Sequence, residues 1–293
     1  MRKISRESYV PYLLIAPAMA FLFLFTVWPL LRQVYLSFFS YNLVNPDMKF
    51  VGFKNYKELL FVKKDFLQAM VNTLVFSFSH LFLVLILAMA LALWLFREKR
   101  VDRIARTAIF TPHIIAMVSC AMVWSWLMDV DKGLFNQILH VFRLPGLRWL
   151  NSSQTAMISV VIVSVWKSTG YYMLILAAAL NAIPSEIYEA ADLDNTGVWR
   201  KFAKITLPMI SPQILFLLIM ITINSFQVFD AVRILTDGGP GNATDVLAYY
   251  IYRQAFSNFK IGYASAAGTI FMLIISALTA LYFKGLSNKV HYQ

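Results

Sequence analysis

Polar side chains stand inside long apolar runs at two places in the chain, and these residues are the best suited to chemistry. Lys167 lies near the middle of one run, and Asn224, Gln227 and Asp230 follow one another at intervals of three late in another. At 100° per residue, the last three fall toward one face of a helix. Amides and carboxylates bind hydroxyl groups, and a ring such as that of Tyr171 packs on the apolar face of a sugar. These five residues predict a path or binding site for a polar solute.

Lys167 is the most unfavourable of these residues to place in a bilayer. On membrane-insertion scales, a lysine at the centre of a spanning helix costs at least ~2.5 kcal/mol. The side chain is therefore expected to face a wet cavity or a partner rather than lipid. Two roles stay open, a place on the solute path and a structural ion pair with an acid such as Asp230 or Asp129.

The chain lacks the residue patterns of an enzyme. Its histidines are far apart, and none belongs to an H-E-x-x-H or a Cys/His ligand spacing: His80, His113, His140 and His291. The sequence contains neither G-x-S-x-G nor the G-x-x-x-x-G-K-[ST] loop that binds nucleotide phosphates. We predict no catalytic residue and no metal site, and for His80 and His113 a polar contact between helices. If ATP drives the protein, another polypeptide hydrolyses it.

The composition indicates an integral membrane protein. Hydrophobic residues make up 59% of the chain and charged residues 14%, and the mean hydropathy is +0.64. The net charge of +11 comes from basic residues in the loops, where lipid headgroups and topology account for it. We predict membrane lipid as a partner and no nucleic acid. The single cysteine, Cys120, excludes an intrachain disulfide.

Six apolar runs are long enough to cross a bilayer, which takes about 20 residues in a helix. We expect them at about residues 11–31, 71–96, 108–128, 156–180, 207–232 and 263–283. Basic residues crowd short segments beside these runs, most densely in the segment REKRVDRIAR after the second run, which marks a cytoplasmic loop. We predict that both termini and the 184–206 loop lie in the cytoplasm.

The stretch from 184 to 212, PSEIYEAADLDNTGVWRKFAKITLPMISP, is polar and separates two apolar runs. Pro184 suits the first position of a helix, with Ser185 as a candidate cap. This short helix is expected to end near Asp194. The turn from Asn195 to Gly197 can then take left-handed backbone angles.

A second short helix is expected after this turn. Val198, Phe202 and Ile205 recur at i, i+4 and i+7 and form an apolar stripe, and Pro208 closes the helix. Another side is basic and carries Arg200, Lys201 and Lys204. A helix, a tight turn and a second helix with an apolar stripe are typical of a segment that a partner grips.

These residues resemble the EAA signature of the membrane subunits of ABC importers, in the branch that carries carbohydrates. The match consists of Glu189, Ala190, Ala191, Ile205, Leu207 and Pro208. The family pattern usually has Gly seven positions into the motif, where this chain has Asn195. Asn is the commonest substitute for Gly in a left-handed turn, so the same geometry is expected here.

A loop after the fifth apolar run carries the same resemblance. It reads LTDGGPGNAT and is similar to the LT-GGP-T element of carbohydrate permeases, with Thr236, Gly238, Gly239 and Pro240 as the matching residues. Its dense Gly, Pro and Asn content indicates a structured turn, which we expect on the external side. Trp166 and Gly170 are similar to the W-x-x-x-G element of the same family.

The resemblance implies the fold of a type I ABC importer permease, all-α with six transmembrane helices and a cytoplasmic coupling helix. It assigns the following residues to ATPase coupling: Glu189, Ala190, Ala191, Asp194, Gly197, Phe202, Ile205, Leu207 and Pro208. It also implies a second homologous permease subunit, two ATPase subunits that carry ATP and Mg²⁺, and an extracytoplasmic solute-binding protein. The expected solute is a sugar, an oligosaccharide or a polyol phosphate, and the expected location is the bacterial cytoplasmic membrane.

The expected domain organisation has three parts. Residues 1–68 form a tail, the first transmembrane helix and an external loop; residues 69–285 form the transmembrane domain with its coupling loop at 184–208; residues 286–293 form a cytoplasmic tail. Two other functions stay open, an ATP-independent secondary transporter and a membrane scaffold or sensor. A secondary transporter is expected to carry ion-coupling carboxylates inside its spans, and this chain offers little there beyond Asp230. A membrane scaffold or sensor would not explain the paired polar residues in the fifth run.

Overall fold

The computed structural model describes residues 10–44, 47–95 and 100–286, and the chain separates into two compact units. One unit holds residues 1–64 and 251–273, and the other holds residues 65–250 and 274–293. Part of the basic segment REKRVDRIAR and nearly all of the expected C-terminal tail lie outside the described residues.

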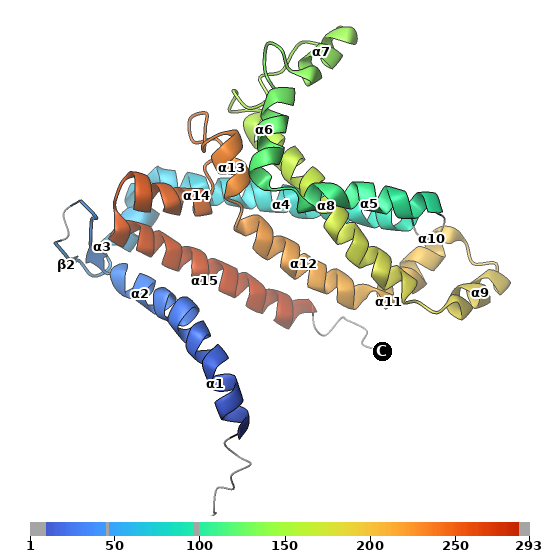
Figure 1. Ribbon diagram of the computed structural model, residues 1–293, viewed down its shortest axis with the longest axis horizontal. Helices are drawn as coiled ribbons and strands as arrows, with labels where there is room; N and C mark the ends of the chain where they lie inside the picture. The colour runs from blue at the N-terminus through green and yellow to red at the C-terminus, as the bar shows by residue number, and fades with distance from the viewer. Residues whose placement is uncertain (1–9, 45–46, 96–99, 287–293) are drawn as a thin grey trace, which may run out of the picture. The chain divides into compact units, whose positions relative to one another are not determined.

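The first unit begins with a continuous helical rod (Figure 1) made of α1 (Val10–Leu22), η2 (Phe23–Val27) and α2 (Trp28–Leu36). The π-helical turn η2 directly precedes Pro29, whose ring nitrogen has no hydrogen to donate to the preceding turn. The apolar span predicted at residues 11–31 is therefore helical, and its helix continues to Leu36.

The external loop expected at residues 32–68 is largely folded instead. Strand β1 (Phe39–Ser40) pairs antiparallel with β2 (Lys49–Phe50), and α3 (Lys54–Lys57) and η3 (Glu58–Val62) follow. Asn55 Nδ2 ties α3 to the hairpin by donating to the Ser37 and Phe39 carbonyl oxygens at 2.8 and 3.0 Å. The loop prediction missed this fold, because contacts between residues far apart in the segment, such as those of the buried Asn55 amide, do not show in the local sequence.

The second unit is built around α4 (Lys64–Trp94), α8 (Ala156–Asn181) and α12 (Ser211–Phe226). The fully buried side chains of these helices include Phe76, Val84, Met173, Leu176, Leu217 and Ile221. In α8 most of the apolar segment is buried, whereas in α4 and in the span that begins with α12 the buried share is 33% and 39%. Helix α8 is thus the most buried of the three, and α4 turns an apolar face outward, as helices beside lipid do.

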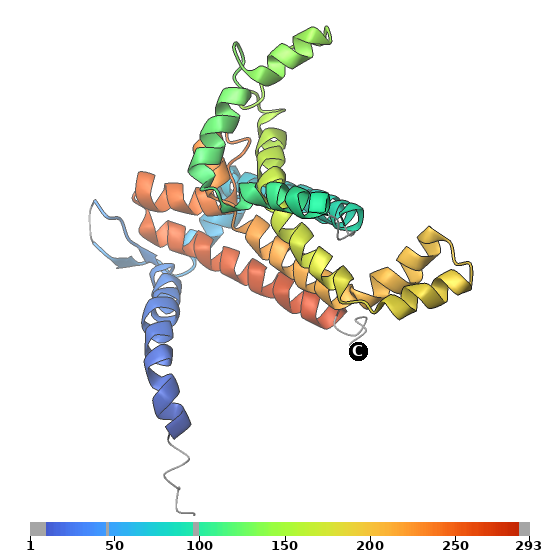
Figure 2. The same ribbon diagram turned by 45° about the vertical axis from the view of Figure 1, so that its right-hand side comes forward.

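The third apolar run, predicted as one helix at residues 108–128, is broken. Helix α5 (Arg100–Ile114) and helix α6 (Met117–Leu127) meet at 100°, and Figure 2 shows the sharp change of direction. Ala116 adopts extended backbone angles between them. Pro112 weakens the last turn of α5 because it cannot donate a backbone hydrogen bond, and the chain leaves the helix three residues later.

The fifth run is also interrupted. Helix α12 ends at Phe226, and α13 (Asp230–Leu235) begins after a three-residue gap. The prediction that Asn224, Gln227 and Asp230 share one face of a single helix is therefore wrong, because the 100° spacing holds only within an unbroken helix.

Five helices of the described residues are long and apolar enough to cross a bilayer, and the number is six if α5 and α6 count as one span. The sixth predicted run corresponds to α15 (Ile261–Leu286). The elements α7 (Leu134–Val141) and α14 (Leu247–Tyr252) are short helices in the connections between these spans.

Candidate functional site

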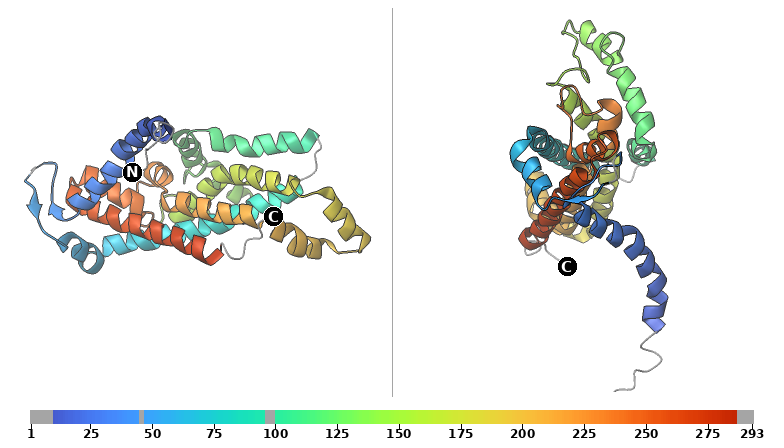
Figure 3. Two further views of the ribbon diagram at one scale, coloured as in Figure 1. Left: turned by 90° about the horizontal axis from the view of Figure 1, so that it is seen from below. Right: turned by 90° about the vertical axis from the view of Figure 1, so that its left-hand side faces the viewer.

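A helical hairpin joins α8 to α12 within the second unit. Figure 3 shows it beyond the ends of those two helices, as α9 (Ser185–Leu193) followed by α10 (Val198–Lys201). Pro184 occupies the cap position and Ser185 is the first residue of α9, so the predicted roles of these two residues are exchanged. Helix α9 ends at Leu193 with Asp194 as its C-cap, so the predicted end near Asp194 is confirmed.

The turn between α9 and α10 closes with Asn195 in the left-handed region, at φ 50°. The Asn195 amide donates to the Asp192 carbonyl, and the Thr196 amide donates to the Ala191 carbonyl, both at 3.0 Å. This pair of bonds is a Schellman motif, in which the first residue beyond the cap takes positive φ. The predicted left-handed turn is confirmed at Asn195. Gly197 has φ −64°, a backbone angle that any residue can adopt, so this position does not require glycine.

The helix that follows does not end at Pro208, as predicted, but one residue later, at Met209. It continues from α10 through the π-helical turn η4 (Phe202–Thr206) and α11 (Leu207–Met209) to the break at Ile210. A π turn just before a proline relieves the clash of the ring with the preceding turn. The proline therefore loosens this helix without stopping it.

Two side-chain contacts hold the hairpin together. The Tyr188 hydroxyl lies 2.9 Å from the Thr206 hydroxyl, and the Lys201 ammonium forms an ion pair with the Asp192 carboxylate. Ala191 is 6% exposed and packs inward. Both contacts bridge α9 to the helix after the turn and so fix the two helices against each other.

The outward face of α9 carries the acidic and apolar residues of the predicted coupling motif. Glu189 and Ala190 are exposed, and Leu193, one turn further along, is 86% exposed. Asp194 and Gly197 are exposed at the turn, while Phe202, Ile205 and Pro208 are half-buried and Leu207 is 38% exposed. The first half of the motif thus faces outward, and the second half joins the hairpin to the helix bundle.

Lys167 bonds to the backbone of the broken span. Its ammonium donates to the carbonyl oxygens of Pro112 at 3.1 Å and His113 at 3.2 Å, and also to that of Ile115. Of the two roles left open for Lys167, the ion pair with Asp230 or Asp129 does not form among the described residues. The positive charge instead caps the end of α5, where the helix dipole is negative.

Aromatic and amide groups form a chain next to this cap. Tyr171 stacks on the His113 ring with centroids 4.6 Å apart, and Tyr172 lies edge-on to Tyr171 at 5.1 Å. Asn224 Nδ2 donates to the Tyr172 hydroxyl at 3.1 Å. The structure therefore joins Tyr171 and Asn224 of the predicted set through Tyr172 and His113. Gln227 and Asp230 are exposed and stand beyond the end of α12.

His80 forms the interhelical contact predicted for it, because its Nε2 lies 3.0 Å from the Ser168 hydroxyl and so bridges α4 to α8. Sequence reasoning identified no contact partner for Ser168 or Tyr172. An aromatic residue and a serine are common in a membrane helix, and only the fold shows that they contact His80 and Asn224.

The turn after α13 is structured, as its composition predicted. Gly238 has φ 78°, and a Cβ added there would lie 2.7 Å from the Tyr249 ring. The Thr236 and Thr244 hydroxyls lie 2.7 Å apart, and Thr244 Oγ1 donates to the Gly239 carbonyl, which precedes Pro240. Burial raises the pKa of Tyr249, whose hydroxyl donates to the Asp237 carboxylate at 2.6 Å.

Helix α4 anchors this turn from outside it. The buried Asn72 amide donates to the carbonyl oxygens of Asn242 and Asp245, both at 2.9 Å, and Thr73 Oγ1 accepts from the Leu247 amide at 2.8 Å. An asparagine within an apolar run was the available signal for this contact. Within the described residues, no three His, Cys, Asp or Glu side chains lie close enough together to hold a metal ion.

Comparisons with known proteins match this chain along its length. A family model described as "Binding-protein-dependent transport system inner membrane component" matches residues 65–292. The chain is 36% identical over 286 residues to the probable ABC transporter permease protein YurN of Bacillus subtilis, with 96% of this chain and 97% of YurN covered. It is 32% identical over 295 residues to the sn-glycerol-3-phosphate transport system permease protein UgpA of Pectobacterium atrosepticum, covering 100% and 99%.

Two further relatives extend these matches. The sulfoquinovosyl glycerol transport system permease protein SmoG of Agrobacterium fabrum is 32% identical over 284 residues, covering 97% of this chain and 92% of SmoG. A chain from the crystal structure of a bacterial ABC transporter involved in the import of the acidic polysaccharide alginate superposes with a TM-score of 0.86 at 23% identity, covering 98% of both chains. This likeness confirms the predicted all-α permease fold.

Proposed function

Because this chain belongs to the binding-protein-dependent transport system inner membrane components, we propose that its α9–α10 hairpin receives an ATPase subunit from the cytoplasm. The chain is a permease subunit of an ABC importer, and a separate subunit hydrolyses ATP. With a second homologous permease it forms the solute path, and two ATPases with bound ATP and Mg²⁺ drive it. An extracytoplasmic binding protein delivers the solute.

The main support for the coupling role is the composition of the outward face of α9. A carboxylate at Glu189 and a largely exposed Leu193 lie on it four residues apart, which places them on one side of the helix. Large apolar side chains left exposed beside charged ones are typical of a docking surface. The Tyr188 and Lys201 contacts make the hairpin rigid enough to pass a force from a partner to α8 and α12.

Solute transfer is assigned to the polar groups around the end of α5. Tyr171, Tyr172 and Asn224 together present rings, hydroxyls and an amide, which suit a sugar, an oligosaccharide or a polyol phosphate. The names of UgpA and SmoG, which refer to sn-glycerol-3-phosphate and sulfoquinovosyl glycerol, support this solute class. ATP drives transport only if the ATPases bind the two states of the path with different affinity.

The coupling role is tested with Glu189→Lys. We expect the variant to insert and assemble normally in the membrane, while ATPase capture in pull-downs from membranes and solute uptake both fall. The charge reversal disfavours docking without touching the bundle. Wild-type uptake by Glu189→Lys would overturn the assignment of α9.

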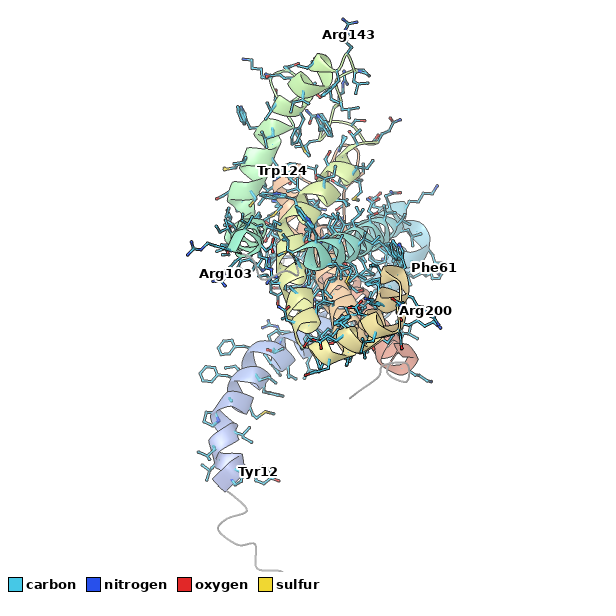
Figure 4. All side chains as sticks on the ribbon, turned by 90° about the vertical axis from the view of Figure 1, so that its right-hand side faces the viewer. Tyr12, Phe61, Arg103, Trp124, Arg143 and Arg200 are labelled. Atoms are coloured by element: carbon cyan, nitrogen blue, oxygen red, sulfur yellow. The ribbon has the colours of Figure 1, made fainter. Side chains whose placement is uncertain are left out.

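The sidedness is tested separately, in a Cys120→Ser background that removes the single native cysteine. Leu193→Cys is expected to react with a membrane-impermeant maleimide only after the cells are broken. Arg143→Cys, at the tip of the loop that follows α7 (Figure 4), is expected to react in spheroplasts. Labelling of Leu193→Cys in spheroplasts would place the hairpin outside and exclude the cytoplasmic ATPase as its partner.

A further inference from the structure

An apolar groove of about 800 Å³ lies between the last turns of α4 and the helix that begins with α10. Its walls come from α4, α8, α9, α10, η4, α11 and α12, all within the second unit. This space is separate from the polar groups around Lys167 and Tyr171, none of which lines it. Such a volume is in the range of sites that hold small molecules.

One wall of the groove belongs to a membrane-spanning helix. Leu85, Met89 and Leu93 line it at intervals of four residues and therefore form one stripe along the last two turns of α4. Leu93 is 40% exposed and α4 ends one residue later, at Trp94. The groove thus lies along the end of a helix that is long and apolar enough to cross a bilayer.

The opposite wall has the residues of a membrane surface. Trp199 is 84% exposed and lines the groove with Phe202, and indole rings gather at the boundary between lipid tails and headgroups. Lys201 also lines the groove, while Arg200 and Lys204 are exposed beside it on the same helical stretch. Figure 4 shows Arg200 extending outward.

The charge at this rim is positive. Lys201 is neutralised by Asp192, but neither Arg200 nor Lys204 forms an ion pair among the described residues. The carboxylates of Glu186, Glu189 and Asp194 belong to α9 and its end, and none of them lines the groove. Basic side chains next to the end of a transmembrane helix attract anionic headgroups.

We propose that the groove binds an anionic phospholipid, with an acyl chain against α4 and the phosphate facing Arg200 and Lys204. A sugar is excluded as an occupant because the walls offer it only the hydroxyls of Tyr188 and Thr206 and the Lys201 ammonium, and burying its other hydroxyl groups unpaired is unfavourable. The lipid braces α10 against α4, while the α9 face stays free for a protein partner. The proposal holds whether or not α9 is the ATPase docking site.

The test uses the full-length chain, purified with its partner subunits in nanodiscs of phosphatidylcholine. One sample contains a trace of phosphatidylglycerol with a diazirine at the end of an acyl chain, and the other contains phosphatidylcholine with the same label. After illumination, peptide mass spectrometry locates the labelled residues. We expect the anionic probe to label the 85–93 and 198–207 segments more strongly than the neutral probe does.

Two variants separate the two parts of the site. Arg200→Gln with Lys204→Gln lowers the preference for the anionic probe by about fivefold for each charge removed, while labelling by the neutral probe stays the same. Ala90→Trp fills the groove from α4 and lowers labelling by both probes. Arg100→Gln with Arg103→Gln, two exposed positions of α5 outside the groove, is the matched control and leaves the preference unchanged.

Equal labelling by the two probes would overturn the assignment of the headgroup. Labelling confined to other helices, or insensitive to Ala90→Trp, would overturn the groove as an acyl-chain site. Protection of both segments by a cross-linked subunit would identify a protein as the occupant and exclude the lipid. Glu189→Lys is expected to leave the labelling unchanged, so a failure of ATPase docking is distinguished from a failure of lipid binding.

Discussion

The Lys167 ammonium lies 3.1 Å from the carbonyl oxygen of Pro112, and by this bond a residue of α8 holds the end of α5. Two more carbonyl oxygens, those of His113 and Ile115, accept from the same ammonium. A helix that ends inside a membrane leaves carbonyls that water cannot reach. Lys167 satisfies them, which makes it part of the reason that the third span can bend.

Replacing Lys167 with methionine tests this role, because methionine keeps the length of the side chain and removes every donor. We expect Lys167→Met to destabilise the protein by about 1–3 kcal/mol, since several carbonyls lose their only strong partner. Thermal unfolding of the purified complex measures this change. Lys132→Met, at an exposed loop position, is the control. A melting temperature equal to that of the control would show that the three bonds contribute nothing.

Gly170 sets the distance between α5 and α8. A Cβ at this position would lie 2.1 Å from the Ile109 carbonyl oxygen, which no flexible side chain can relieve because the neighbour is backbone. We expect Gly170→Ala to push the helices apart and cost about 1–3 kcal/mol, as overpacking does. A loss of solute uptake should accompany it, because Tyr171 follows directly on α8.

The control for this substitution is Gly197→Ala, where nothing lies within 4 Å of the new Cβ and φ is negative. We expect Gly197→Ala to change the free energy of unfolding by no more than about 0.5 kcal/mol, as a surface substitution does, and to leave the melting temperature nearly unchanged. If both alanine variants have the melting temperature of the wild type, the close approach of Ile109 to Gly170 does not set the distance between α5 and α8.

Asn195 tests the geometry of the hairpin turn. Valine at φ 50° is strained by about 1–2 kcal/mol, whereas glycine adopts this angle freely. We therefore expect Asn195→Val to lower ATPase capture and uptake, and Asn195→Gly to retain both. Amide hydrogen exchange of residues 185–206 reports whether the turn has opened. A fully active Asn195→Val would mean that coupling does not need this turn.

The sequence located most of this architecture because apolar runs have to be long in a bilayer. The run at 156–180 matches α8 almost to the residue, and the end of α9 near Asp194 follows from the turn residues after it. The left-handed angle of Asn195 was predictable for the same reason, since few residues adopt it. These features depend on local chemistry that the sequence displays.

The breaks were harder to predict. Pro112 signals a weak last turn in α5, but a 100° bend also needs Lys167 to accommodate the released carbonyls, and the two residues are 55 positions apart. The gap between α12 and α13 contains no proline or glycine. A search for a partner of Lys167 among acidic side chains failed because the acceptors are backbone atoms, which every residue carries.

Asn72 links the structured turn after α13 to α4, and its replacement by aspartate tests that link. The two side chains have nearly the same shape, but a carboxylate only accepts hydrogen bonds, so the Asn242 and Asp245 carbonyls would each lose a donor and face a negative charge. We expect Asn72→Asp to cost about 2–6 kcal/mol, since leaving each of the two acceptors unpaired costs about 1–3 kcal/mol. Limited proteolysis within residues 236–245 should become faster.

Asn151→Asp, at an exposed position, provides the control. Unchanged proteolysis in Asn72→Asp would show that the turn keeps its shape without α4, and Thr73 would then be the residue to replace next, because its hydroxyl accepts from the Leu247 amide.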